Sequence, residues 1–133
     1  MWLLFIDIGY ILKTLAVVVT TPPYSHLTIT AIDYIEAALK AGIDVIGVFF
    51  YQDGVMHANA DVSIASDEFQ AIKHWQQLQQ EFQLPLHICV TAAEKRGIAC
   101  DSLANKKINQ AFTVSGLGEL VELTTKAARL VQF

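Results

Sequence analysis

Residues 84–101, LPLHICVTAAEKRGIACD, hold both cysteines of the chain and pass from an apolar run directly into a helical pattern. The run LHICV, residues 86–90, predicts a buried strand, and TAAEKRG, residues 91–97, predicts a short helix that ends at Gly97. A strand that leads straight into a helix is the repeating unit of parallel α/β sheets. Cys89 lies near the carboxyl end of this strand, just before the helix start.

The same alternation extends in both directions along the chain. Apolar, β-branched runs predict further strands, and amphipathic spacing between them predicts helices. The other expected strands are TLAVVVTT (14–21), IDVIGVFFY (43–51) and RLVQF (129–133), and the other expected helices are residues 27–42, 67–82 and 115–129, the last two capped by Ser66 and Ser115. Residues 52–66 predict a polar loop, and residues 101–112 remain ambiguous. We therefore expect an α/β fold, a small three-layer sandwich with a mainly parallel sheet of about five strands and helices on both faces.

The composition is that of a well-buried domain. The chain has 133 residues, of which 53% are hydrophobic and 17% are charged, and its net charge is −4. A protein that binds nucleic acid directly usually carries a basic face. The only basic clusters here, Lys95-Arg96 and Lys106-Lys107, are typical of solvated helix ends. We expect no direct contact with nucleic acid, and the high apolar content suggests surface that remains for a protein partner.

The first twelve residues, MWLLFIDIGYIL, form an apolar N-terminal extension (1–12) to a single domain of residues 13–133. Asp7 and Lys13 interrupt the apolar run, and each is costly at the centre of a membrane span. The stretch also lacks the basic start and the small-residue cleavage site of a signal peptide. Two cysteines without CxxC spacing do not make a disulfide framework. We therefore expect a cytoplasmic protein with reduced thiols and no membrane segment.

The carboxyl ends of parallel strands meet at one edge of the sheet, where ligands bind. This rule places residues 20–26, 49–55 and 89–95 together. The first of these segments, TTPPYSH, has two prolines and no glycine, which disfavours a dinucleotide or P-loop site. SGLGEL, residues 115–120, is glycine-rich and opens a helix, but tight packing of helix against sheet is a commoner cause than an anion site. No zinc-finger spacing and no hydrolase triad order is present, which disfavours a zinc site and a hydrolase.

Cys89 allows two interpretations. Most free cysteines are small buried hydrophobic residues. At the sheet edge before a helix start, however, an accessible thiol would be stabilised as the thiolate, which is the form that attacks sulfur. His26 and His57 lie in loops at this edge, and either can polarise a thiol, although most such histidines are plain loop residues. His74 and His87 are expected to be structural or surface residues. Position alone leaves the choice open.

Several segments form an ordered set along the chain. They are VVVTTPPY (17–24), GVFFYQDGV (47–55), ASDEF (65–69), WQQL (75–78), LHICVTAAEKRG (86–97), and FTVSGLGEL (112–120) with the terminal VQF. This set resembles the TusD-like sulfurtransferase subunits of the DsrE/DsrF-like family, from about residue 14 to the C-terminus. The turn PPYSH departs from the glycine-containing version expected in the family, which leaves the roles of Ser25 and His26 undefined.

The resemblance implies a small α/β fold and a sulfurtransferase that needs no metal or organic cofactor. Such subunits assemble with TusB-like and TusC-like subunits into a heterohexamer, which relays sulfur from a TusA-like donor to a TusE-like acceptor for 2-thiouridine at the tRNA wobble position. The relay cysteine lies in the motif LHICVTAA and maps onto Cys89, the site of a cysteine persulfide intermediate, while Cys100 lies outside the motif. By placement alone, Tyr24, Tyr51 and His57 are expected to shield that persulfide.

Three other functions are compatible with the sequence. A DsrE-type subunit of a sulfur-oxidation complex would use the same cysteine and the same chemistry with other donors, and the sequence separates it poorly from the tRNA pathway. A non-catalytic assembly subunit is disfavoured because Cys89 is present in its motif. A flavodoxin-like ligand-binding domain would carry an inert cysteine.

Overall fold

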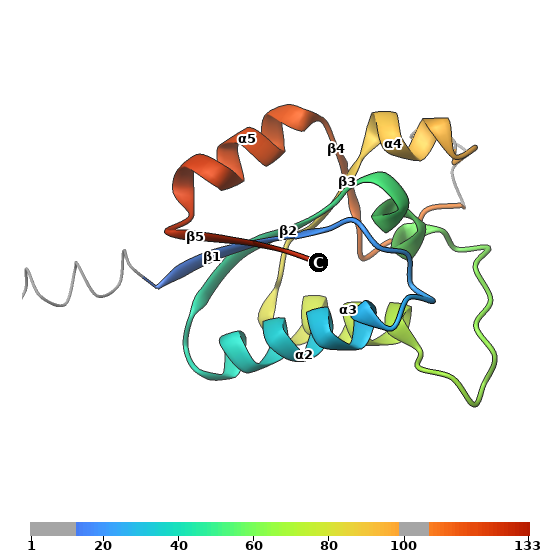
Figure 1. The fold of residues 1–133 in the computed structure, drawn as a ribbon, viewed down its shortest axis with the longest axis horizontal. Coiled ribbons are helices and arrows are strands. Elements are labelled where there is room, and N and C mark those ends of the chain that lie inside the picture. The colour runs from blue at the N-terminus through green and yellow to red at the C-terminus, as the bar shows by residue number, and fades with distance from the viewer. Residues whose placement is uncertain (1–12, 99–106) are drawn as a thin grey trace, which may run out of the picture.

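A computed structural model describes residues 13–98 and 107–133 of the chain. Within these residues the centre is a five-stranded sheet in the order β4-β3-β2-β1-β5, and every neighbouring pair of strands is parallel (Figure 1). The strands are β1 (Thr14–Val19), β2 (Asp44–Phe50), β3 (Leu86–Cys89), β4 (Thr113–Ser115) and β5 (Arg129–Gln132). The predicted parallel sheet is confirmed.

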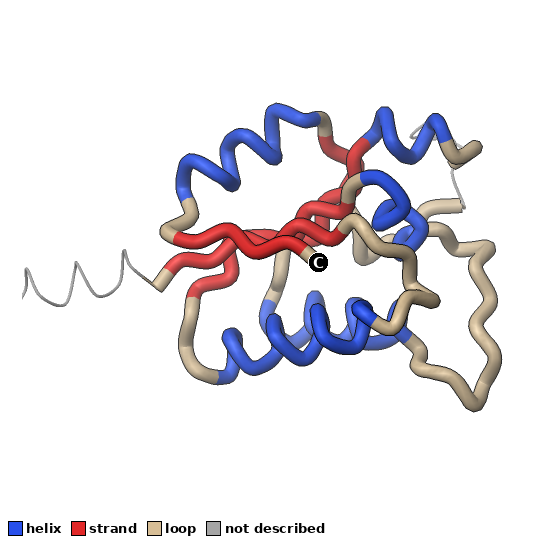
Figure 2. The backbone as a smooth tube through the Cα atoms, in the orientation of Figure 1, coloured by secondary structure: helices blue, strands red, loops and turns tan. Residues whose placement is uncertain are grey.

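Helices cover both faces of the sheet and complete the predicted three-layer sandwich (Figures 1 and 2). The helices α2 (Leu27–Lys40) and α3 (Ala71–Phe82) pack against each other on one face. The helices α4 (Val90–Lys95) and α5 (Leu117–Lys126) lie on the other face. Crossovers of this kind are required because parallel neighbours all run in the same direction.

The two central strands are continuous apolar runs because both of their faces are covered. All of β1 after its first residue is buried, and so are the last four residues of β2. Their pairing ends with Val19 opposite Phe50, so both strands leave the sheet at the same edge.

The segment after β2, expected as a polar loop, begins with a 3-10 helix, η1 (Gln52–Ala58), that is partly buried. Its His57 is completely buried. The indole Nε1 of Trp75 in α3 donates a 2.9 Å hydrogen bond to His57 Nδ1. The ring proton of His57 is therefore on Nε2, which donates to the carbonyl oxygen of Thr21 over 3.0 Å. One imidazole thus links η1, α3 and the segment after β1.

Gly54 allows η1 to lie directly on the end of β1. A Cβ atom at this position would overlap the carbonyl oxygen of Val19. The close approach of two backbones therefore requires glycine here.

The start of α3 differs from the prediction. The helix begins at Ala71 rather than at residue 67, and Ser66 is not its cap. The side-chain amide of Gln70 donates to the carbonyl oxygens of Ile64, Ala65 and Glu68 over 3.2, 2.8 and 3.3 Å. These bonds hold the preceding segment in a turn outside the helix, an alternative that polar side chains offer the backbone.

The strand β4 was not predicted, because it lies between the ambiguous segment of residues 101–112 and the helix expected from Ser115. Ser115, expected as a helix cap, ends this strand, and the N-cap of α5 is Gly116. Thr113 and Val114 are exposed in the described structure, so no buried apolar run marks the strand in the sequence.

In the part of the chain that the structure describes, no helix is both long and apolar enough to cross a membrane. The expected extension of residues 1–12 lies outside that part.

The buried imidazole generates a prediction about pH. Burial lowers the pKa of His57 to about 4, although its hydrogen bond to Thr21 acts in the opposite direction. In the unfolded chain the pKa is about 6.5, so between these values the unfolded state binds more protons. The free energy of unfolding therefore falls as the pH drops from about 6.5 toward 4, by about 3 kcal/mol in total.

The measurement is urea unfolding of the wild-type protein and of His57→Gln between about pH 7 and pH 4.5. The variant lacks this titration, so its deficit in unfolding free energy should shrink as the pH falls. His26→Gln removes an exposed imidazole outside this network and is the control. A deficit of His57→Gln that does not change with pH would contradict the assignment.

Candidate active site

The strands β1, β2 and β3 are neighbours, so their carboxyl ends open on one edge of the sheet (Figure 1). The backbone amide of Tyr51 donates to the carbonyl oxygen of Val19 over 2.9 Å, which joins the ends of β1 and β2. The helix α4, after β3, packs on η1, after β2. The prediction that residues 20–26, 49–55 and 89–95 meet at this edge is confirmed.

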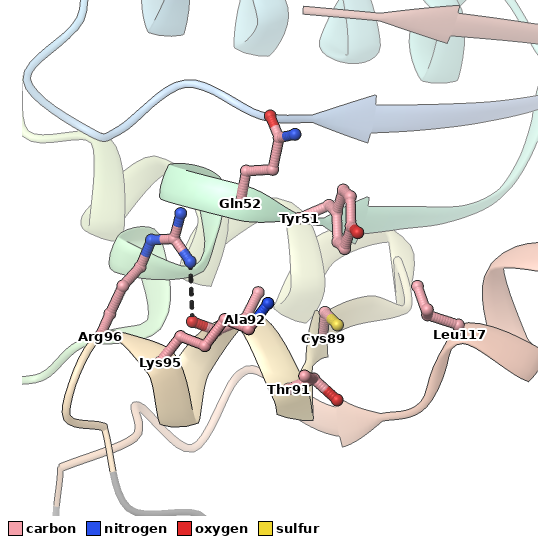
Figure 3. A pocket seen from close by; sticks show the side chains of 8 residues that line it. All are labelled: Tyr51, Gln52, Cys89, Thr91, Ala92, Lys95, Arg96 and Leu117. Carbon is pink, nitrogen blue, oxygen red and sulfur yellow. Dashed lines mark hydrogen bonds between the residues drawn. The ribbon is translucent and has the colours of Figure 1, made fainter.

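Cys89 is the last residue of β3 and the N-cap of α4, with φ and ψ of −70° and 120°. Its backbone is extended and lies opposite Ser115, the last residue of β4. The cysteine is free. Its sulfur points into the space between Tyr51 and Leu117 (Figure 3).

The expectation of an accessible thiol is wrong, because the exposed fraction of Cys89 is 0%. Tyr51 follows β2 and Leu117 begins α5, and both line the same pocket as the cysteine. Their side chains lie on either side of the sulfur (Figure 3). The sequence around Cys89 contains neither residue, so the local pattern indicated an open strand end.

The pocket in front of Cys89 has a volume of about 420 Å³ (Figure 3). It is lined by polar, apolar and cationic side chains: Tyr51, Gln52, Cys89, Thr91, Ala92, Lys95, Arg96 and Leu117. Two of these residues are cations, and no carboxylate is among them. A lining of this sign attracts anions to the pocket.

The two cations have different surroundings. The guanidinium Nε of Arg96 donates to Asp53 Oδ1 of η1 over 2.9 Å, and its Nη1 donates to the carbonyl oxygen of Ala92 over 2.9 Å. Arg96 therefore fastens the end of α4 to η1. Lys95 has no ion-pair partner among the described residues. Its ammonium is the cation left for a ligand in the pocket.

A second group of side chains holds the start of α5. His87 Nδ1 lies 2.9 Å from Ser115 Oγ, and His87 Nε2 lies 3.6 Å from Glu119 Oε1. His87 is thus a structural residue, as expected, and it fixes the two ends of the turn that carries Leu117. The predicted tight packing at SGLGEL is wrong, because a Cβ at Gly116 or Gly118 would meet no atom within 4 Å.

The histidines proposed to polarise the thiol lie elsewhere. His57 is hydrogen-bonded beneath η1 and does not line the pocket of Cys89. Because burial lowers its pKa to about 4, it is neutral near pH 7. His26 and Tyr24 line a separate pocket near the start of α2. Of the three residues expected to shield a persulfide, only Tyr51 reaches Cys89.

Sequence reasoning missed the pocket residues Gln52, Thr91, Lys95, Arg96 and Leu117. The sequence could have indicated the two cations, because residues three and seven positions after Cys89 lie on the same face of a helix as Cys89. That spacing selects Ala92 and Arg96, and Lys95 lies beside them. Leu117 has no such signal because it reaches the site through tertiary packing.

Cys100, which lies outside the predicted relay motif, also lies outside the described residues. Within residues 13–98 and 107–133, no three His, Cys, Asp or Glu side chains are grouped so that they would hold a metal ion.

The fold and site define a small α/β protein with a free thiol at the carboxyl edge of a parallel sheet. The chain belongs to the DsrE/DsrF-like family, whose model matches residues 13–133. This family is associated with sulfur transfer, which supports a sulfur-relay type of role for the chain in general. The crystal structure of the ychN protein from E. coli has a similar fold, with a TM-score of 0.72. The match covers 91% of this chain and 98% of that one, at 18% sequence identity.

The covered thiol yields a prediction about reactivity. Leu117→Ala should make Cys89 react severalfold faster with iodoacetamide, because the truncated side chain uncovers the sulfur. Val121→Ala is the matched control, one turn further along α5, exposed and not in the pocket lining. Peptide mapping by mass spectrometry separates label on Cys89 from label on Cys100. Equal rates for the two variants would show that Leu117 does not limit access.

Proposed function

We propose that the chain is the sulfur-carrying subunit of a protein relay, in which Cys89 receives sulfur from a TusA-like donor and passes it to a TusE-like acceptor. The relay would supply sulfur for 2-thiouridine at the tRNA wobble position. Membership of the DsrE/DsrF-like family supports the sulfur chemistry. The observation that carries the proposal is the placement of the Cys89 sulfur, which points into a cation-lined pocket at the carboxyl edge of the sheet.

The chemistry is two successive displacements at one sulfur atom. The Cys89 thiolate attacks the outer sulfur of the donor persulfide, a new S–S bond forms, and the donor leaves as a thiolate. The acceptor thiolate then attacks the same outer sulfur, and Cys89 is released as a thiolate. Each bond that breaks is replaced by a bond of the same kind, so no external oxidant or reductant is consumed.

The surroundings of Cys89 suit this role in two ways. Lys95 and Arg96 place positive charge at the pocket where the attacking and leaving sulfurs are anionic. Cys89 is completely buried, with Tyr51 and Leu117 on either side of its sulfur, and this burial would protect a persulfide from unrelated thiols. Such protection matters because a persulfide exchanges with any thiolate that reaches it.

The relay would operate in the cytoplasm within an assembly that includes TusB-like and TusC-like subunits. Exposed large apolar side chains support the existence of partners. In the described residues they include Tyr24 before α2, Leu27, Ile29 and Tyr34 on α2, and Val114, Leu117 and Val121 on β4 and α5.

The first test replaces the carrier atom. Cys89→Ser and Cys89→Ala should both fold, with a loss of about 1–3 kcal/mol of unfolding free energy from a buried hydroxyl or a lost thiol. Neither variant can form a persulfide, so 2-thiouridine in tRNA should disappear from cells that depend on the chain. The measurements are the thermal midpoint and the 2-thiouridine content of digested tRNA.

Cys100→Ser is the matched control and should retain thiolation. A folded Cys89 variant that still supports 2-thiouridine would show that Cys89 is not the carrier. Loss of thiolation in Cys100→Ser alone would transfer the role to that residue.

The second test concerns assembly. Light scattering should give a mass well above the 14.7 kDa of one chain, because isolated chains would leave the apolar side chains in water. Coexpression with TusB-like and TusC-like subunits should give one stable complex. A monomer at micromolar concentration in the presence of both subunits would contradict the proposal.

A further inference from the structure

The pocket at Cys89 is larger than one inserted persulfide needs. Its volume of about 420 Å³ lies in the range of small-molecule sites, about 300–1,000 Å³. The sulfur is completely buried at its wall and has no hydrogen-bond partner among the described residues. A slender small molecule reaches a sulfur in that position more easily than the surface of a folded protein does.

The polar groups of the pocket indicate the charge of such a molecule. The lining holds Lys95 and Arg96 and no carboxylate, so an anion is attracted and a cation is repelled. Arg96 is already engaged by Asp53 and the Ala92 carbonyl. Lys95 has no ion pair within the described part of the chain. Gln52 and Thr91 supply further hydrogen-bonding groups.

We propose that this pocket binds a low-molecular-weight anionic hydropersulfide, which loads Cys89 with sulfur directly, and that Lys95 recognises its carboxylate. This inference rests on the proposed function, since Cys89 must be the sulfur carrier. It adds a substrate class and a specificity-determining residue, and it gives the chain a loading route that needs no protein donor.

The loading step balances without another reactant. The Cys89 thiolate attacks the outer sulfur of R–S–SH, the new S–S bond forms at Cys89, and the bond between the two donor sulfurs breaks. The products are the Cys89 persulfide and R–S⁻, which takes a proton from water. The carboxylate of R stays intact and serves only to hold the donor.

The experiment compares two donors that differ only at the carboxyl group, which is anionic in one and neutral in the other: the hydropersulfide of N-acetylcysteine and that of its methyl ester. Intact-mass spectrometry measures the rate at which one sulfur atom is added to the full-length protein. For the wild type, the rate should saturate with the anionic donor and exceed that of the ester by roughly three- to tenfold. Added salt should reduce this preference, because the Lys95 side chain is exposed to solvent.

Variants test the residue. Lys95→Gln should bring the ratio of the two rates close to one, and Lys95→Glu should invert it. Lys73→Gln, an exposed lysine on α3 outside the pocket, is the matched control and should keep the wild-type ratio. Lys95 could also bind an acidic side chain of a protein donor. The assay contains no protein donor, so faster loading by the acidic small donor shows that Lys95 recognises the carboxylate of a small molecule.

Three results would overturn the inference. Equal rates for the two donors in the wild type would show that the pocket does not prefer an anion. An unchanged ratio of the two rates in Lys95→Gln would show that Lys95 does not recognise the carboxylate. In both cases loading of Cys89 would still support the proposed relay. Absence of loading by either donor and by a persulfidated TusA-like protein would instead refute both the inference and the relay.

Discussion

The structure depends on the burial of both faces of β1 and β2. Strands that are apolar on both sides need a layer of helices above and another below, and this requirement fixes the order of the chain through crossovers. Because every strand then runs in the same direction, all carboxyl ends lie at one edge. Cys89 ends β3 and Tyr51 follows β2, so the sheet alone brings a thiol and an aromatic ring to the same place.

The helix η1, which lies at that edge, is held mainly by polar contacts outside the sheet. Gly54 lets η1 lie against the carbonyl of Val19, and His57 bonds this short helix to Trp75 and Thr21. Asp53 lies in the same helix and holds Arg96 at the end of α4. A buried imidazole that does not line the pocket therefore supports one of its walls, because it anchors the short helix whose Asp53 holds Arg96.

The sequence contains enough information for the architecture because strand and helix periods are local. It also singles out Cys89, since the junction of LHICV and TAAEKRG is visible in adjacent residues. The boundary at α3 was not predictable from Ser66, because Gln70 competes for the backbone carbonyls of that turn. The strand β4 is short and exposed, so its own sequence pattern does not identify it. It is a strand because it pairs with His87 and Cys89 of β3.

The burial of the thiol is the feature least accessible to sequence reasoning, since Leu117 comes from a helix far along the chain. Sulfur transfer nevertheless requires a second sulfur atom to approach Cys89. The backbone of Tyr51 is anchored to the end of β1 by the hydrogen bond from its amide to the carbonyl oxygen of Val19. Leu117 lies between Gly116 and Gly118, where added side chains would meet no atom within 4 Å. Packing therefore does not demand either glycine.

Gly116 is the N-cap of α5, where glycine is well tolerated, whereas Gly118 lies in the first turn and weakens the helix because glycine loses more conformational freedom on folding. What holds this turn is His87, through its contacts with Ser115 and Glu119, and the Glu119 carboxylate is partly exposed. The thiol side of the pocket is thus fixed by the sheet and by η1, whereas on the α5 side His87 of β3 contacts both ends of the turn that carries Leu117.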